Sequence, residues 1–270
     1  DPPADLLPES VRDQLEFPPL VDALGYVHRP PAGASLELLE DGRHPAQRRL
    51  AFEELLAHHL SLRLLRGRIR SHRAPRLRGG SGLLERFLDA LPFELTGAQN
   101  RVLEDILADM SEDKPMLRLV QGDVGSGKTV VAAAAAVVAA DAGFQAAVMA
   151  PTELLAEQHF RTLENWLSPL GVGVTWLTGR LTAKARRKAL EEIAGGQASV
   201  IVGTHALFQA GVEFARLGLA VIDEQHRFGV HQRLALTEKG GADGTRPHQL
   251  VMTATPIPRT LAMSSYADLD

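Results

Sequence analysis

A glycine-rich stretch that ends in lysine and threonine is the feature of this chain most able to do chemistry. Residues 122–129 are Gly-Asp-Val-Gly-Ser-Gly-Lys-Thr and fit the pattern G-x-x-x-x-G-K-[ST]. Glycines let a loop curl until successive backbone N–H groups point at phosphate oxygens. We therefore expect a nucleoside triphosphate site, in which Lys128 reaches the β- and γ-phosphates and the Thr129 hydroxyl binds magnesium. The expected nucleotide-binding residues of this loop are Gly122, Asp123, Val124, Gly125, Ser126, Gly127, Lys128 and Thr129.

The residues on either side of this loop support the interpretation. The apolar run 116–120 precedes it and is typical of a buried strand, and an alanine- and valine-rich run over 130–140 follows and is typical of a helix. A phosphate loop needs this strand–loop–helix setting, and the helix N-terminus adds partial positive charge. The setting therefore disfavours a chance glycine-rich turn.

Two acidic residues follow a second strand pattern further along the chain. Residues 219–226 are Leu-Ala-Val-Ile-Asp-Glu-Gln-His, so the two carboxylates come at the end of four apolar residues. Asp223 could hold magnesium through water, and Glu224 could orient or deprotonate an attacking water. Alone, such a pair is more often a solvated turn. Together with the phosphate loop it favours catalysis, with Glu224, Asp223 and Lys128 as the catalytic candidates.

From residue 93 onward, strand patterns alternate with helix patterns, and these elements must position the candidate residues. Strand patterns cover 116–120, 145–150, 174–177, 199–202, 217–222 and 249–253, and helix patterns cover about 98–110, 129–142, 153–168, 182–194 and 230–238. Strands that are apolar on both faces and separated by helices predict an α/β fold with a central, mostly parallel sheet. Such sheets bind ligands beyond the carboxyl ends of their strands, where the candidate residues fall.

The first 90 residues lack this alternation of strand and helix patterns. A pattern with apolar residues every four positions predicts a helix over 45–70, and a short helix is expected over 83–90. The stretch 73–82 is basic and glycine-rich, which is typical of a linker. We predict an N-terminal helical linker segment over 1–90 and a nucleotide-binding domain over 91–270.

The composition excludes several classes of protein. The 270 residues contain no cysteine, which excludes a disulfide scaffold, a cysteine-ligated zinc site and a thiol nucleophile. No apolar run is long enough to predict a membrane span, and we expect a cytoplasmic protein. The chain starts with Asp1 instead of Met, which suggests a fragment or a processed chain.

The net charge of −4 gives no overall basic field, but arginines cluster in one segment. The segment contains no acid, so it could bind phosphates or be a solvated face. Its seven arginines are Arg63, Arg66, Arg68, Arg70, Arg73, Arg76 and Arg78.

The motifs, taken in order, resemble those of superfamily 2 helicases and translocases. The Asp-Glu-x-His run at 223–226 is typical of that superfamily. Five further stretches resemble the other motifs of its first RecA-like motor domain, namely 93–99, 150–158, 178–179, 203–205 and 253–255. The resemblance implies that Gln99 and Phe93 recognise the adenine base. It implies that His226, Thr253, Ala254 and Thr255 couple hydrolysis to movement. It also implies that the nucleic-acid backbone is held by Pro151, Thr152, Thr178, Gly179, Gly203, Thr204 and His205.

Simpler structural roles stay open for several of these residues. Thr152, Thr178 and Thr204 follow predicted strands and could each be a helix cap or turn residue. His226 could be a structural histidine bonded to a neighbouring loop.

More narrowly, the stretches 122–129, 222–231 and 252–260 resemble the RecG family of branch-migration DNA helicases. The resemblance implies ATP and Mg²⁺ as cofactors, branched double-stranded DNA such as stalled forks and Holliday junctions as partner, and a role in recombination and repair in the bacterial nucleoid. It also implies a second RecA-like domain that supplies arginine fingers, and a wedge domain, in the same parent chain. We therefore expect this chain alone to be nearly inactive as an ATPase.

Two alternatives remain. Transcription-repair coupling translocases share most of these motifs but typically carry Glu where this chain has Gln225. The other alternative is a nucleotide-binding module without motor activity.

Overall fold

The computed structural model describes residues 4–34, 36–70, 72–209, 211–223 and 244–254. The chain divides into two compact units, Asp1–Arg66 and Gly67–Asp270. The predicted helix over 230–238 lies outside the described residues. None of the helices in the described ranges is long and apolar enough to cross a membrane.

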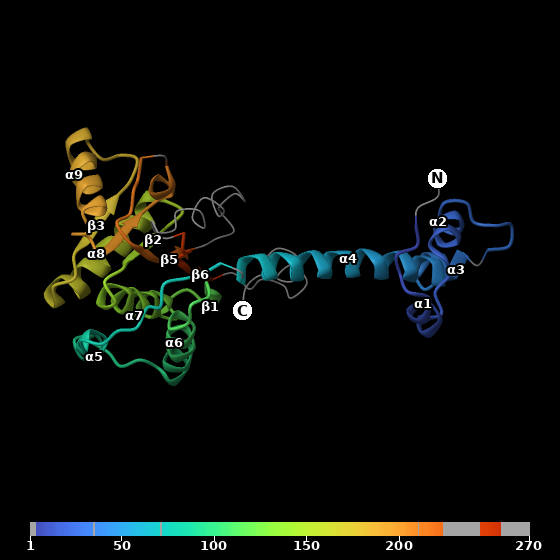
Figure 1. Cartoon of the computed structure of the whole chain (residues 1–270), viewed down its shortest axis with the longest axis horizontal. Helices are drawn as coiled ribbons and strands as arrows, with labels where there is room; N and C mark the ends of the chain where they lie inside the picture. The colour runs from blue at the N-terminus through green and yellow to red at the C-terminus, as the bar shows by residue number, and fades with distance from the viewer. Residues whose placement is uncertain (1–3, 35, 71, 210, 224–243, 255–270) are drawn as a thin grey trace. The chain divides into compact units, whose positions relative to one another are not determined.

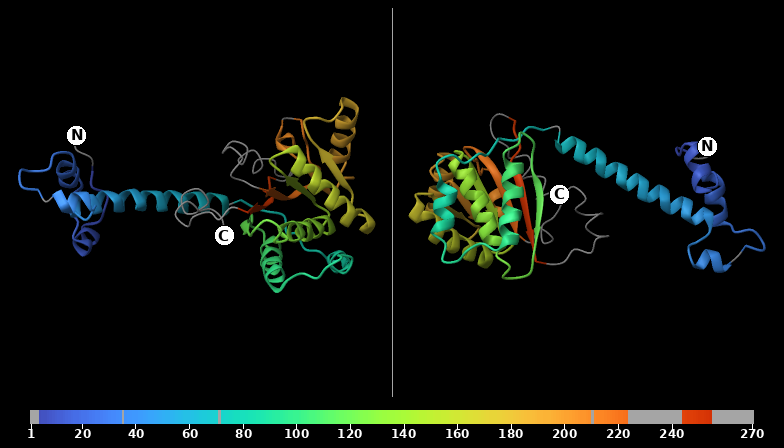
Figure 2. Two further views of the ribbon diagram at one scale, coloured as in Figure 1. Left: turned by 180° about the vertical axis from the view of Figure 1, so that it is seen from behind. Right: turned by 90° about the horizontal axis from the view of Figure 1, so that it is seen from below.

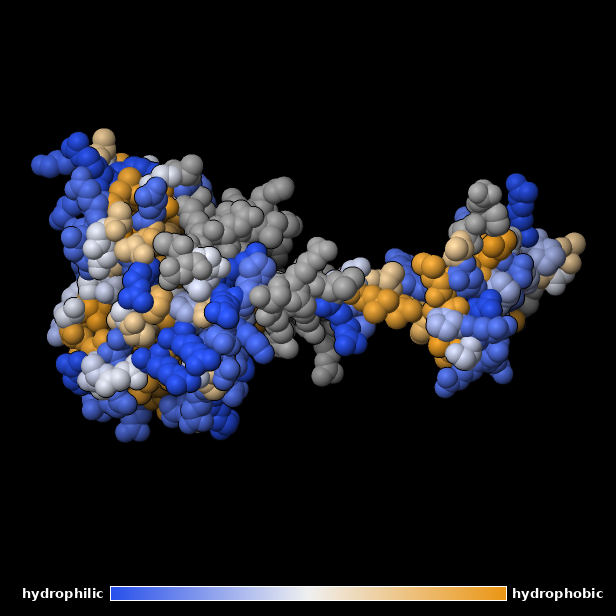
Figure 3. Space-filling model, in the orientation of Figure 1, coloured by the Kyte–Doolittle hydropathy of each residue, from blue (hydrophilic) through white to orange (hydrophobic). Residues whose placement is uncertain are grey.

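The first unit is helical, as its sequence predicts. It contains α1 (Glu9–Leu15), α2 (Leu20–His28) and α3 (Leu36–Glu40), and it holds most of α4 (Pro45–Arg70), which coincides with the predicted helix (Figure 1). Apolar side chains on its surface include Leu6, Val21, Leu38, Leu55 and Leu60, and Figure 3 shows hydrophobic patches on this unit.

A partly buried charge network organises the first unit. One carboxylate oxygen of Asp5 accepts hydrogen bonds from the Leu7 amide at 3.1 Å and from Nη2 of Arg49 at 2.7 Å. Its other oxygen accepts from the Leu20 amide at 3.0 Å and from Nη1 of Arg12 at 3.2 Å. Burial alone would raise the pKa of Asp5, but these four donors outweigh it and hold the pKa below its ordinary value. Asp5 thereby joins α1, α2 and α4.

The second unit is built on a six-stranded sheet. Its strands are β1 (Leu117–Gln121), β2 (Gln145–Met149), β3 (Val174–Leu177), β4 (Val200–Gly203), β5 (Leu217–Asp223) and β6 (His248–Thr253). Their order is β1-β6-β5-β2-β4-β3, and all five neighbouring pairs are parallel. The predicted α/β fold is confirmed, and each strand lies within one or two residues of its predicted range (Figure 1).

Helices cover both faces of the sheet because its strands are apolar on both faces. α7 (Lys128–Asp141) and α8 (Glu153–Leu167) pack on one face, together with α5 (Leu83–Asp89) and α6 (Gly97–Met110), which rest on α7 (Figure 2). α9 (Ala183–Ala194) and the short 3₁₀ helix η2 (His205–Phe208) pack on the other face. In β2, Val148 points to the first face and Met149 to the second, as the two-residue period of a strand requires.

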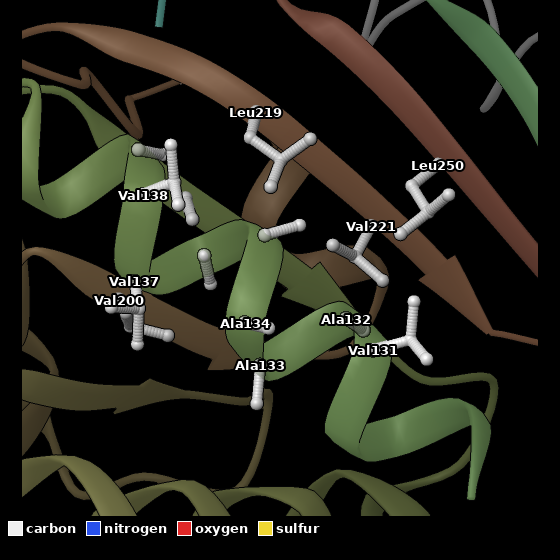
Figure 4. Close-up of a cluster of buried hydrophobic side chains, with 14 of the residues drawn as sticks. Val131, Ala132, Ala133, Ala134, Val137, Val138, Val200, Leu219, Val221 and Leu250 are labelled. Carbon is white, nitrogen blue, oxygen red and sulfur yellow. The ribbon is translucent and has the colours of Figure 1, made fainter. Parts of the chain in front are cut away.

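The helix after the phosphate loop is buried along nearly its whole length. Every residue from Val130 to Ala139 is buried. Figure 4 shows Val131 and Ala132 of α7 beside Val221 and Leu250 of the sheet. Alanine side chains allow the helix axis to approach the sheet closely.

The glycine-rich stretch 73–82, whose composition is typical of a linker, packs against other elements of the second unit. The Leu77 amide donates to the carbonyl of Met110 at 2.8 Å, and the Leu77 side chain is buried in the main core. Asp141, at the end of α7, accepts hydrogen bonds from the amides of Gly80 at 2.8 Å and Ser81 at 3.1 Å. With Phe87 of α5 also buried, the compact unit begins near residue 67, whereas the sequence-based boundary is at residue 90.

His248, the first residue of β6, fastens the same stretch to the sheet. Its buried ring accepts a hydrogen bond from the Met116 amide at Nδ1, at 3.1 Å, and donates from Nε2 to the carbonyl of Pro75, at 2.7 Å. Burial lowers the pKa of His248, and the Pro75 carbonyl and Asp109 offset this only in part. The neutral ring thus connects residues that are far apart in the chain.

Candidate active site

The phosphate loop lies between β1 and α7, as its sequence predicts. Gly125 and Gly127 adopt left-handed conformations, with φ of 83° and 81°, and the Ser126 amide donates to the Asp123 carbonyl at 3.1 Å. Gly127 is the N-cap residue of α7. The loop therefore has the curled backbone and the adjoining helix N-terminus that bind phosphate.

Lys128 folds back over this loop. Its Nζ donates to the carbonyl oxygens of Gly122 at 2.6 Å and Asp123 at 2.9 Å. A lysine ammonium has three donor hydrogens, and two of them are accounted for by these bonds. The side chain thus holds positive charge at the start of the loop, and Thr129 follows it in the first turn of α7.

Gln99, predicted to read the adenine base, fastens the loop to α6. Its Oε1 accepts from the Thr96 amide at 2.8 Å, its own amide donates to Thr96 Oγ1 at 3.2 Å, and its Nε2 donates to the Ser126 carbonyl at 2.9 Å. Gln99 is so close to Gly127 that a Cβ atom there would lie 2.2 Å from Nε2. A role for Gln99 in base recognition stays a prediction, and the bonds to Thr96 and Ser126 are a role that the sequence analysis missed.

An open pocket of about 590 Å³ lies next to the start of α6, with Asn100 of that helix in its lining. Phe93, the other predicted adenine contact, lines this pocket, and its ring makes an edge contact with Trp166 at 6.2 Å between centroids. Among the described residues, the lining consists of Leu88, Asp89, Leu91, Pro92, Phe93, Glu94, Leu95 and Asn100. A half-exposed aromatic ring at such a pocket is suited to stacking on a flat base.

Asp223 ends β5, and His159 of α8 contacts it. The distance between His159 Nε2 and Asp223 Oδ2 is 2.8 Å, and both side chains are mostly buried, with 12% and 13% exposed. The sequence analysis missed His159, because the two residues are 64 positions apart and no motif contains the histidine. Glu224 and His226 lie outside the described residues.

The coupling stretch joins the same edge of the sheet. Thr253 ends β6 and pairs with Gln121 of β1, and its carbonyl accepts a hydrogen bond from the Gly122 amide at 3.3 Å. Ala254 follows directly, and Thr255 lies outside the described residues.

The residues predicted to hold nucleic acid follow the other three strands. Pro151 and Thr152 come after β2, Thr178 and Gly179 after β3, and Gly203, Thr204 and His205 at the end of β4. Thr152 caps α8 by accepting from the Leu155 amide at 3.3 Å, so the helix-cap alternative describes part of its role. Thr178 and Thr204 are buried, and His205 is exposed.

Three further features mark this group. A Cβ at Gly203 would lie 2.1 Å from the Leu177 carbonyl, so only glycine fits there. In the residues that the structure describes, the buried hydroxyl oxygen of Thr204 has no hydrogen-bond partner. Nearby, Arg180, with 87% of its side chain exposed, pairs with Glu153 of α8 at 2.7 Å.

The strand order separates the nucleotide candidates from the nucleic-acid candidates. The phosphate loop, Thr253 and Asp223 lie at the carboxyl ends of β1, β6 and β5, which are neighbours in the sheet. The nucleic-acid candidates follow β2, β4 and β3, which are also neighbours. In a parallel sheet all carboxyl ends lie at one edge. That edge is therefore divided into two adjoining halves, although the motifs alternate along the chain.

Comparison with known proteins identifies the family. The model for the DEAD/DEAH box helicase family matches residues 96–264, which include every candidate site residue except Phe93. The chain belongs to this family. A structural likeness to a hypothetical ATP-dependent RNA helicase from Sulfolobus tokodaii, with 20% identity and a TM-score of 0.50, agrees with the fold.

The relatives of this DEAD/DEAH box helicase chain include RecG proteins. It is 56% identical to the ATP-dependent DNA helicase RecG of Haemophilus influenzae over 99% of its own length, and 57% identical to that of Escherichia coli K12 over 98%. It also matches a structure of RecG bound to a three-way DNA junction, with 40% identity over 99% of the chain and a TM-score of 0.81. The resemblance to RecG is thus confirmed. The chain spans 38% of the length of the two relatives and 35% of the chain in that structure.

Proposed function

We propose that this chain is the ATP-binding half of the motor of a RecG-type DNA helicase, which acts on branched DNA in recombination and repair. The observation that carries the proposal is the divided sheet edge. A phosphate loop and a carboxylate occupy one half, and hydroxyl and backbone groups suited to phosphate contacts occupy the adjoining half. A motor needs these two sites side by side on one rigid element so that a change at one reaches the other.

The residues of the nucleotide half fit Mg-ATP. The left-handed glycines and the close approach of Gln99 give the loop the backbone shape that a triphosphate requires, and Lys128 supplies positive charge. Thr129 and Asp223 would hold Mg²⁺, which would neutralise charge that develops on the phosphates. Glu224 would orient and deprotonate the attacking water.

We place the adenine base in the pocket that Phe93 lines. Phe93 would stack on the base, while Gln99 would reach its edge after exchanging its bond to Ser126. His226, Thr253, Ala254 and Thr255 would pass the change at the phosphates to the rest of the motor.

The other half of the edge would bind the DNA backbone. The unpartnered, buried hydroxyl of Thr204 is a group that a phosphate oxygen could satisfy. His205 and the amide groups after β2 and β3 add donors in the same place. The RecG relatives, one of them bound to a three-way junction, support branched DNA as the partner over the transcription-repair alternative.

The parent protein would complete the site. A second RecA-like domain would supply arginine fingers, and a wedge domain would split the junction. We propose that the protein works in the bacterial nucleoid.

The test is the DNA-stimulated ATPase of the full-length parent protein on a three-way junction and on a linear duplex. We expect greater stimulation by the junction. Lys128→Ala should remove most Mg-ATP binding in calorimetry, and Glu224→Gln should abolish turnover with binding retained, because an amide cannot accept the proton. Turnover that DNA leaves unchanged would contradict a motor, and unchanged nucleotide affinity in Lys128→Ala would contradict the site.

A further inference from the structure

One contact crosses the boundary between the two halves of the sheet edge. His159 belongs to α8, the helix that follows β2 and its nucleic-acid candidates, whereas Asp223 ends β5 in the nucleotide half. The imidazole Nε2 lies 2.8 Å from Oδ2 of the carboxylate. Both side chains are nearly nine-tenths buried, so little water competes for this hydrogen bond.

The helix that carries His159 is fixed at its start. Thr152 caps α8, and Glu153 in its first turn pairs with Arg180 after β3. His159 comes seven residues after Thr152, which corresponds to about 10 Å along a helix at 1.5 Å per residue. Ala156, between them, is completely buried. Two turns of an anchored helix thus separate the imidazole from the turn after β2, which is predicted to hold the DNA backbone.

The chemistry of the pair favours a positioning role. A carboxylate oxygen only accepts hydrogen bonds, so the imidazole donates from Nε2. The bond engages Oδ2 and restricts the rotation of the carboxylate, and Oδ1 would remain available to a metal ion or its water. Groups that hydrogen-bond a metal ligand orient it, and their loss typically lowers metal affinity or activity by about 10- to 100-fold.

We propose that His159 is a positioning residue, which orients the Asp223 carboxylate for Mg²⁺ and ties it to the turn after β2. This inference rests on the proposed function, because it requires that Asp223 meets magnesium on a bound nucleotide. It adds a residue that belongs to neither the phosphate loop nor the Asp-Glu-x-His run.

The test uses the full-length parent protein and a fluorescent ADP analogue. Affinity for the analogue is measured in EDTA and as a function of Mg²⁺ concentration. We expect His159→Ala to leave the metal-free affinity unchanged and to raise the Mg²⁺ concentration for half-maximal effect by roughly 10- to 100-fold. His159→Gln should restore most of the loss, because its Nε2 can donate from a similar position.

Two comparisons separate positioning from a structural role. Asp223→Asn should show the same defect, and adding His159→Ala to it should make the defect no larger, because the histidine acts through that carboxylate. Arg161→Ala, on the same helix with 72% of its side chain exposed, should match the wild type. Thermal melts should show His159→Ala to be folded.

The outcomes are distinct. A wild-type Mg²⁺ response in His159→Ala, with Lys128→Ala still defective, would overturn this inference and leave the proposed function standing. It would also be overturned if His159→Ala weakened the Mg²⁺ response of Asp223→Asn as much as it weakens that of the wild type. If the wild-type parent binds no nucleotide with or without Mg²⁺, the proposed function and this inference both fall.

Discussion

The amide N–H of Gly122 points at the carbonyl oxygen of Thr253, 3.3 Å away. Gly122 opens the phosphate loop, and Thr253 opens the Thr-Ala-Thr stretch. Because the bond joins main-chain atoms at the ends of two paired strands, a displacement of the loop reaches the coupling stretch without passing through any side chain. This gives the proposed coupling role of Thr253 a direct structural route.

Gly127→Ala should destabilise the second unit and weaken nucleotide binding. The residue has a φ of 81°, and an added Cβ would lie 2.2 Å from Gln99 Nε2. We expect a loss of about 1–3 kcal/mol from the backbone conformation alone, and a further loss as Gln99 is displaced. Urea unfolding and titration with labelled nucleotide would measure the two effects.

Gly125→Ala is the matched control for that substitution. Its φ of 83° gives a similar backbone cost, but a Cβ there meets nothing within 4 Å. It should therefore be the milder of the two. Equal losses would show that the contact with Gln99 is unimportant.

Thr96→Ala and Gln99→Ala should have different consequences. Both remove part of the cap of α6, and loss of such a cap costs about 1 kcal/mol. Only Gln99→Ala also removes the bond to the Ser126 carbonyl. We expect comparable losses of stability by chemical denaturation, and weaker nucleotide binding for Gln99→Ala alone. Equal nucleotide affinity in the two variants would assign Gln99 a capping role only.

His248 should make the second unit sensitive to mild acid. Its folded pKa lies below the ordinary value of 6.5, so the unfolded chain binds the proton more readily. The stability is fully present above pH 6.5 and is lost as the pH falls from there towards the folded pKa. His248→Gln should reduce the difference in urea midpoint between about pH 8 and pH 5.5. If the variant kept the full wild-type difference in urea midpoint, a group other than His248 would be responsible for the acid sensitivity.

The arginine-rich segment can be tested through the salt dependence of DNA binding. Arg63 and Arg73 are exposed, whereas Arg76 pairs with Asp113 at 3.2 Å. If the segment contacts DNA phosphates, replacing Arg63 and Arg73 by alanine should lower the log–log salt slope by about 0.9 per lost contact. Arg76→Ala should lower it less, because Asp113 already offsets that charge. Titrations of the parent protein at several salt concentrations would measure the slope, and an unchanged slope would indicate a solvated face.

The phosphate loop was predictable because its determinants are local. Glycines at 125 and 127 occupy the positions that need positive φ, and a strand and a helix flank them at short range. The strands could be predicted equally well, since a strand that is buried on both faces has a continuous apolar run, such as 217–222. The division of the sheet edge follows from strand order, which no single strand encodes.

The contacts that sequence analysis missed are long-range. Nothing near His159 or Asp223 indicates that the two meet, and the same holds for Arg49, whose partner Asp5 is 44 residues away. The packing of the stretch 73–82 could not be predicted, because Leu77 stands among arginines and glycines without a helical or strand period. The stretch is held by hydrogen bonds from the Leu77 amide to Met110 and from His248 to Pro75, and both partners lie in other elements.

Helix α7 has a consequence for how the phosphate loop can move. Six of the ten buried residues from Val130 to Ala139 lack any side-chain torsion, because they are alanines. Burying an alanine costs no rotamer entropy, and an alanine offers no alternative rotamer. The helix therefore cannot respond to events at the loop by rearranging these side chains. A displacement that begins at Gly127 must be carried by α7 as a rigid body, with the sheet residues beside it taking up the strain.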